Sequence, residues 1–255
     1  MGLTRRELIS GLGAFGLIYT LSGCANISKE ELKSIQNLMQ KEFNANKIYN
    51  ELPKHIHIAE TIADTNEYGE RKTKGCGVIV DQHYITMQHI VNAGSKLQRQ
   101  TPWGLMEEPL TVKSQKTYIQ GKELEEIFIG SNKDDVAVYK LPKDLNLPDF
   151  PAKPSSTINL GDKIYIIGNP GLSGSNVRED YISDIDGTAG ENMKELAENT
   201  TDCFGIGKIV IPGDSGTPIV NSKFELLGLC KYQFAGGLGY VQKIDCYLKH
   251  INSKK

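Results

Sequence analysis

Ser215 lies in a glycine-flanked segment, and a serine in such a segment can act as a nucleophile. The segment reads Ile-Pro-Gly-Asp-Ser-Gly-Thr-Pro-Ile-Val over positions 211–220. Gly213 and Gly216 allow a sharp turn, and the amides of Gly213, Asp214 and Ser215 can then point at one developing negative charge. The same composition suits an ordinary turn. The segment alone therefore leaves a catalytic and a structural interpretation open.

A serine hydroxyl needs a neighbouring base, and that base needs a carboxylate to orient it. His89 follows a short apolar run that indicates a β-strand, and Asp135 directly precedes the apolar run Val136–Val138. A carboxylate beside a buried strand is costly unless it has a hydrogen-bonded partner. We therefore expect Asp135 to orient His89 and Asp134 to be a solvated turn residue. Each residue alone suits a packing or turn role, but their joint occurrence favours nucleophilic catalysis.

These segments, together with Gly161–Leu172, resemble the trypsin-like serine proteases of the chymotrypsin fold from about Ile56 to Ile251. The family's histidine, aspartate and serine blocks fall on 85–91, 135–138 and 213–216. Their order along the chain is that of chymotrypsin and differs from the order in subtilisins and α/β-hydrolases. The Gly-Asn-Pro at 168–170 is closer to the bacterial high-temperature-requirement branch than to digestive trypsins.

Two positions depart from the family pattern. Thr217 stands where glycine is usual, and Met87-Gln88 stand where small residues are typical. Neither departure replaces a catalytic atom.

The resemblance implies an all-β fold of two six-stranded antiparallel β-barrels, with an added helix at each end of the chain. His89 and Asp135 would come from the first barrel and Ser215 from the second. The implied activity is that of a serine endopeptidase acting through an acyl-enzyme. Ser215 would attack, His89 would move the proton, and the amides of Gly213, Asp214 and Ser215 would hold the oxyanion. The alternative is a catalytically silent barrel that serves as a binding or chaperone-like scaffold. Neither requires a cofactor.

Substrate preference follows from the same resemblance. In the family, the residue six positions before the nucleophile sets the pocket floor, and here that residue is Ile209. It offers no carboxylate to a substrate arginine or lysine. The pocket wall is expected from Cys230, Lys231, Tyr232 and Gly239, with Cys230 as a wall residue and not a catalytic thiol. We expect cleavage after small or medium apolar residues, or after acidic ones if Lys231 turns into the pocket.

Residues 1–23 indicate an export signal. Arg5 and Arg6 precede an uncharged segment that is too short to be a good membrane span, and Thr4–Ile9 resembles a twin-arginine signal. Leu21–Cys24 resembles a lipoprotein box, in which Cys24 is lipidated and becomes the new N-terminus. The mature protein would then be anchored on the extracytoplasmic face of a membrane. An uncleaved N-terminal anchor is the alternative, and it leads to the same face.

The remainder divides into a spacer and a protease domain. Residues 24–52 would form the lipidated N-terminus and a helix beginning with the capping-box spacing of Ser28 and Glu31. This helix could pack on the barrel or act as a spacer. Residues 53–255 would form the protease domain. Its first barrel would cover about 53–141 and its second about 155–243, with a proline-rich linker between them and a closing helix over 244–251.

Composition restricts the partners. With a formal net charge of −2 over 255 residues, the composition is not basic enough to indicate nucleic-acid binding, so the expected partners are protein or peptide substrates and, through the lipid, a membrane. The oligomeric state is left open. The cysteines and histidines do not have zinc-site spacing, and no metal is expected. Besides Cys24 there are four cysteines, which permit up to two disulfides in three connectivities if all pair: Cys76, Cys203, Cys230 and Cys246.

Overall fold

The computed structural model describes residues 29–92, 96–101, 104–131, 134–168, 176–185, 202–207, 210, 213–233 and 239–253. The chain divides into two compact units, residues 1–46 and residues 47–255. Each unit is described by itself below. The proposed signal 1–23, Cys24 and Ile209 lie outside the described residues.

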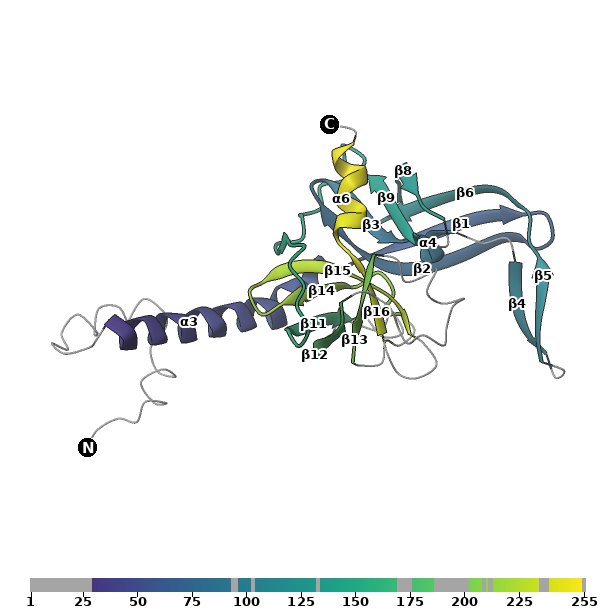
Figure 1. The fold of residues 1–255 in the computed structure, drawn as a ribbon. Coiled ribbons are helices and arrows are strands. Elements are labelled where there is room, and N and C mark those ends of the chain that lie inside the picture. The colour runs from purple at the N-terminus through teal and green to yellow at the C-terminus, as the bar shows by residue number, and fades with distance from the viewer. Residues whose placement is uncertain are drawn as a thin grey trace. The chain divides into compact units, whose positions relative to one another are not determined.

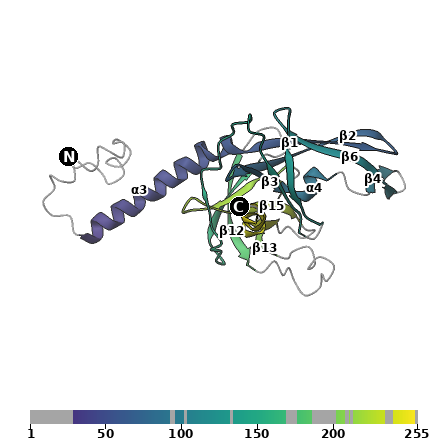
Figure 2. The same cartoon turned by 90° about the horizontal axis from the view of Figure 1, so that it is seen from above.

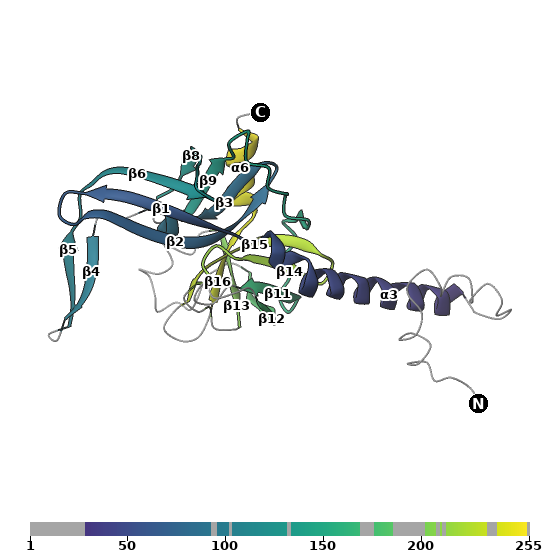
Figure 3. The same ribbon diagram turned by 180° about the vertical axis from the view of Figure 1, so that it is seen from behind.

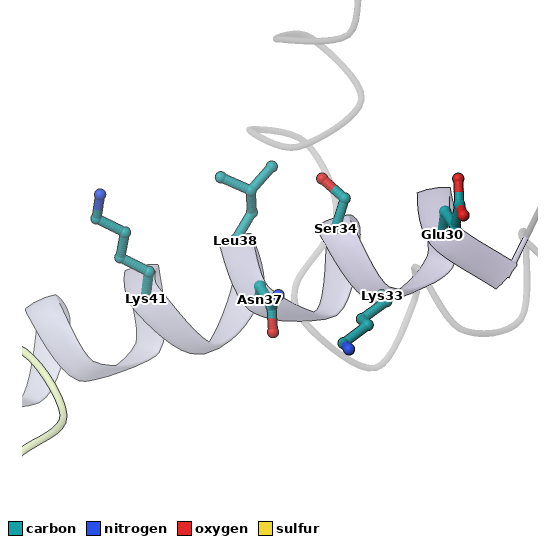
Figure 4. A pocket seen from close by; sticks show the side chains of 6 residues that line it. All are labelled: Glu30, Lys33, Ser34, Asn37, Leu38 and Lys41. Atoms are coloured by element: carbon teal, nitrogen blue, oxygen red, sulfur yellow. The ribbon is translucent and has the colours of Figure 1, made fainter.

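Helix α3 spans Lys29–Asn50, within the range 24–52 in which the sequence predicts a helix. Within the first unit, the apolar side chains of Leu38 and Phe43 on α3 are exposed, at 45% and 52%. Figure 4 shows Leu38 on the same side of α3 as the polar Ser34. No helix among the described residues is long and apolar enough to cross a membrane.

The first sheet of the second unit contains six longer strands and one two-residue strand, all antiparallel. The turn at 81–82 separates β2 from β3, and both strands are buried where they pair. The spatial order is β7-β6-β1-β2-β3-β9-β8, and the long β1, β2 and β6 run side by side (Figure 2). Its strands are β1 (His57–Thr65), β2 (Gly69–Val80), β3 (His83–Met87), β6 (Val112–Ile119), β7 (Lys122–Glu123), β8 (Glu125–Ile129) and β9 (Val136–Lys140).

The second barrel has six longer strands in the order β15-β14-β11-β12-β13-β16, and pairing of β15 with β16 closes it. A two-residue strand, β10 (Lys153–Pro154), adds to β15 in parallel. The predicted chymotrypsin-like double barrel is thus confirmed, with the first barrel built as a half-barrel. The six strands are β11 (Lys163–Gly168), β12 (Asn176–Asp184), β13 (Cys203–Ile206), β14 (Pro218–Asn221), β15 (Glu225–Gln233) and β16 (Gly239–Lys243).

A separate hairpin, β4 (Lys96–Thr101) and β5 (Gly104–Pro109), was not predicted. The sequence Lys-Leu-Gln-Arg-Gln-Thr of β4 lacks the apolar alternation that signals a half-buried strand. The hairpin lies at the end of the first sheet that is remote from α6 (Figures 1 and 3).

The hydrophobic core is shared by both barrels, and two short helices contribute to it. The 3-10 helix η1 (Leu52–His55) and helix α6 (Asp245–Asn252) each bury apolar side chains. Helix α6 lies beside β9 (Figure 1), and its fully buried Tyr247 donates a hydrogen bond to the sulfur of Met87 at 3.0 Å. Met87, one of the two departures from the family pattern, is therefore a packing residue at the end of β3.

The four cysteines within the described residues are all buried free thiols. Burial raises the pKa of Cys203 and of Cys230 to about 12, so both thiols stay protonated at neutral pH.

Candidate active site

His89 occupies a one-turn helix, α4 (Gln88–Val91), directly after β3. Strand β3 pairs with β9 so that Met87 lies opposite Val136. This register places Asp135 beside α4, where the Gln88 amide donates to the Asp135 carbonyl at 3.2 Å. Strand pairing thus brings together two residues that are far apart in sequence.

The Asp135 carboxylate accepts two kinds of hydrogen bond from His89. The backbone N–H of His89 donates to Oδ1 at 2.9 Å, and Nδ1 lies 3.0 Å from Oδ1 and 2.9 Å from Oδ2. Asp135 is 4% exposed, whereas the His89 side chain is 44% exposed. Because an ionised carboxylate only accepts, Nδ1 carries the proton. Nε2 is then left with the lone pair that a general base requires.

Asp135 is held in an unusual backbone conformation. Its φ is 49°, a left-handed value that costs a non-glycine residue about 1–3 kcal/mol unless the surroundings compensate. Its amide donates to the Ser131 carbonyl at 2.8 Å. The adjacent Asp134 is exposed and bonds only the Ser131 side chain among the described residues. The two neighbouring aspartates therefore have different surroundings, with only Asp135 turned toward His89.

Ser215 lies in a tight turn, residues 213–217, which we call the serine turn. Gly213 and Gly216 have φ values of 99° and 80°, which glycine alone adopts without penalty. Within the described part of the chain, Ser215 Oγ donates to the Lys231 carbonyl at 3.3 Å, and no hydrogen bond joins it to His89. The serine and the histidine are therefore not hydrogen-bonded in this conformation.

Several polar groups of the serine turn are bonded internally or to β15. The amide and the hydroxyl of Thr217 donate to the Asp214 carbonyl at 2.9 Å and 2.6 Å, and Gly216 donates to the Cys230 carbonyl at 2.8 Å. No hydrogen bond between described residues uses the amides of Gly213 or Ser215. These two donors are available to an oxyanion. Thr217, a departure from the family pattern, thus stabilises the turn.

The serine turn also touches the first sheet at Cys76. The Cys76 thiol lies 3.6 Å from the Gly213 carbonyl oxygen, and the Cys76 carbonyl accepts the hydroxyl of Thr86 at 2.6 Å. A Cβ at Gly216 would overlap that same carbonyl. The backbone of the serine turn therefore packs directly against the backbone of β2.

Sequence reasoning missed Arg178, although a signal for it was present. Asp214 has no exposed surface, and its Oδ2 lies 2.5 Å from Arg178 on β12. The argument that a buried carboxylate needs a partner was applied to Asp135 but holds equally for Asp214. It could have predicted a cation, although not its identity.

The predicted pocket residues are only partly described. Ile209 and the side chain of Tyr232 lie outside the description. Cys230 and Lys231 are fully buried, and the Lys231 ammonium donates to the Gln242 side-chain oxygen at 3.1 Å. Gly239 pairs with β13 in the barrel wall. The Lys231 ammonium is thus bonded within the second barrel. The part of the chain that the structure covers holds no cluster of acidic, histidine or cysteine side chains suited to a metal ion.

Comparison with known proteins identifies the family. Residues 75–229 match the model of the trypsin-like peptidase domain, and this range contains the three candidate catalytic residues. The chain is 29% identical over 164 residues to a probable periplasmic serine endoprotease, DegP-like, of Buchnera aphidicola subsp. Baizongia pistaciae, covering 63% of this chain and 31% of that protein. It is 27% identical over 192 residues to the serine endoprotease DegS of Escherichia coli K12, covering 71% and 46%.

The fold is also found among solved structures. An HtrA-type protease, AlgW, solved with a tripeptide, superposes with a TM-score of 0.53 at 22% identity, covering 83% of this chain and 62% of that one. This likeness concerns the fold alone. The chain spans less than half the length of each of the two curated relatives named above.

Proposed function

This chain belongs to the trypsin-like peptidase family, and from that membership we propose that it is a serine endopeptidase. Ser215 attacks the scissile carbonyl, His89 removes the serine proton and later delivers it to the leaving amine, and Asp135 orients His89. The amides of Gly213 and Ser215 stabilise the oxyanion, with that of Asp214 between them. The observation that supports the proposal most is the pairing of both His89 donors with the buried Asp135 carboxylate.

The reaction requires one change from the described conformation. The Ser215 hydroxyl must leave the Lys231 carbonyl and approach Nε2 of His89. Catalytic hydrogen bonds are often long or unformed without substrate. We propose that an acyl group bound at the serine turn favours this movement.

Labelling with a fluorophosphonate probe tests the proposal. Wild-type protein should be labelled, and Ser215→Ala should abolish both labelling and peptide cleavage. His89→Ala should reduce labelling and peptide cleavage to a similar extent because triad members act as a unit. Circular dichroism of each variant checks that the fold persists. Labelling that persists in Ser215→Ala would refute the assignment of the nucleophile.

The alternative function is a catalytically silent scaffold. The hydrogen bond from Ser215 to the Lys231 carbonyl favours it, because that contact leaves His89 without the hydroxyl. A folded wild-type protein that resists fluorophosphonate at every concentration, while binding unfolded polypeptide, would support the scaffold and exclude the protease.

For location, we propose export and lipid anchoring outside the cytoplasm. The relatives named above include a probable periplasmic protease, and Arg5-Arg6 with Leu21–Cys24 support export followed by lipidation. Two acyl chains anchor firmly where one holds only marginally. Mass spectrometry of the native protein should find a lipidated Cys24 as the first residue, and Cys24→Ser should release the protein from membranes. An intact, unmodified segment 1–23 would contradict this proposal.

For substrate preference, we propose cleavage after small or medium apolar residues. The argument rests on Ile209 as the pocket floor, where a substrate cation would lack a partner at a cost of several kcal/mol. A peptide library profiled with the active protein checks it. A dominant preference for arginine or lysine would refute the pocket assignment, and one for acidic residues would indicate that Lys231 reaches the substrate.

A further inference from the structure

Asp214, which precedes the proposed nucleophile, has a fully buried carboxylate that is paired with a side chain from another strand. Its Oδ2 lies 2.5 Å from the Arg178 guanidinium, whose side chain is 21% exposed. We propose that Arg178 is a positioning residue for catalysis. By holding the Asp214 carboxylate in the interior, it fixes the serine turn and, with it, the amides of Gly213 and Ser215. This inference rests on the proposed function of Ser215.

The position of Asp214 makes it the anchor of the turn. Its carbonyl accepts both hydrogen bonds from Thr217, so its backbone and its side chain are held by different partners. Gly213 and Gly216, which flank the pair Asp214-Ser215, impose little backbone preference of their own. The conformation of the serine turn therefore depends on these anchors. An ionised carboxylate without its cation would be too costly to keep buried, and the turn would rearrange or the acid would take up a proton.

The lack of a side chain at Gly168 leaves room for the ion pair of Arg178 with Asp214. A Cβ at Gly168 would lie 2.5 Å from Asp214 Oδ1 and 2.7 Å from an Arg178 guanidinium nitrogen. Gly168 has no left-handed φ, so its small size and not its backbone freedom accounts for the glycine. Any larger residue would displace the pair while leaving both charges in the protein. Gly168 thus offers a second, independent way to perturb the pair.

Arg178 also faces a second buried acid. Asp180 is 5% exposed and lies two residues along β12, so its side chain leaves the strand on the same face as that of Arg178. The charges of Asp214, Arg178 and Asp180 all act on the buried Cys230 thiol, whose pKa is raised to about 12 chiefly by burial. Arg178 is therefore a cation among buried acids next to the serine turn.

The test compares Arg178→Met with a matched control, Lys163→Met. Lys163 on β11 forms an ion pair at 2.7 Å with Glu179, the residue next to Arg178 on β12, and the Lys163 side chain is 32% exposed. Arg178→Met should lower the maximal rate of fluorophosphonate labelling by about 100-fold, the loss typical of one oxyanion donor, with little change in the half-saturating probe concentration. Lys163→Met should label like wild type. Arg178→Lys should recover part of the rate because it keeps the charge but not the planar fork.

A double variant separates positioning from stability. Arg178→Met with Asp214→Asn removes the unpaired buried charge, so its melting temperature should recover toward wild type. Its labelling rate should stay low. Gly168→Ala should slow labelling with both charges still present. Wild-type labelling in Arg178→Met, or recovery of both rate and melting temperature in the double variant, would overturn the inference.

Hydrogen exchange gives a readout that does not need activity. The amides of Gly216 and Thr217 are hydrogen-bonded and should lose protection in Arg178→Met but not in Lys163→Met. If wild-type protein is not labelled at all, the proposed function fails. The exchange result still decides whether Arg178 positions the turn, and unchanged protection in Arg178→Met would overturn that role.

Discussion

Gly216→Ala adds one methyl group at the contact between the serine turn and the first sheet. The new Cβ would overlap the Cys76 carbonyl oxygen and would lie 2.9 Å both from the Cys76 carbonyl carbon and from the Thr86 hydroxyl. Cys76 lies in β2, which is hydrogen-bonded to β1 and β3 on its two sides. Since β2 cannot move easily, the serine turn must.

Two costs contribute to the expected destabilisation. Gly216 has a φ of 80°, and a left-handed conformation costs an alanine about 1–2 kcal/mol. Overpacking of a well-packed site costs about 1–3 kcal/mol more. The free energy of unfolding should therefore fall by about 2–5 kcal/mol. A shift of the turn by about 1 Å should also slow fluorophosphonate labelling by about 100-fold.

Gly161→Ala is the matched control. Gly161 has the same φ of 80°, but a Cβ there would meet no heavy atom within 4 Å. Its cost should be the backbone part alone, about 1–2 kcal/mol, with normal labelling. Urea unfolding of both variants gives the difference. Equal destabilisation by the two substitutions, or normal labelling of Gly216→Ala, would refute the argument that the turn is packed against Cys76.

Three other predictions concern the histidines, the carboxylates and the thiols. Asp135→Asn should lower the turnover number by about 10⁴-fold because an amide favours the wrong His89 tautomer, whereas Asp134→Asn should have little effect. Steady-state peptide cleavage measures both, and equal losses would refute the assignment of Asp135 as the carboxylate that orients His89. Burial, with a smaller contribution from nearby His55, lowers the pKa of His57 below its ordinary value. The unfolded chain then binds the proton first, so the free energy of unfolding should fall as pH drops below about 6.5, and urea titrations of His57→Gln should show a weaker fall. Iodoacetamide should modify the four buried thiols, those of Cys76, Cys203, Cys230 and Cys246, only after denaturation. Peptide mass spectrometry can show this, and modification of any of the four in the native protein would contradict their burial.

The sequence by itself determined the family and indicated the strands on which its histidine and aspartate motifs lie. Strand β1 and the pair β2–β3 were predictable because apolar patterning and turn residues act locally. The family resemblance singled out His89, Asp135 and Ser215 from the motifs around them. It also implied two barrels, because that is the fold of the family that these motifs resemble.

The tertiary structure alone decided the features that depend on pairing between distant segments. The register of β3 against β9 sets the contact of His89 with Asp135, and the sequence could propose that contact but not its geometry. The ion pair of Arg178 with Asp214 depends on β12 lying against the serine turn. The second barrel closes because β15 pairs with β16. These contacts join residues far apart in the chain, so no local pattern encodes them.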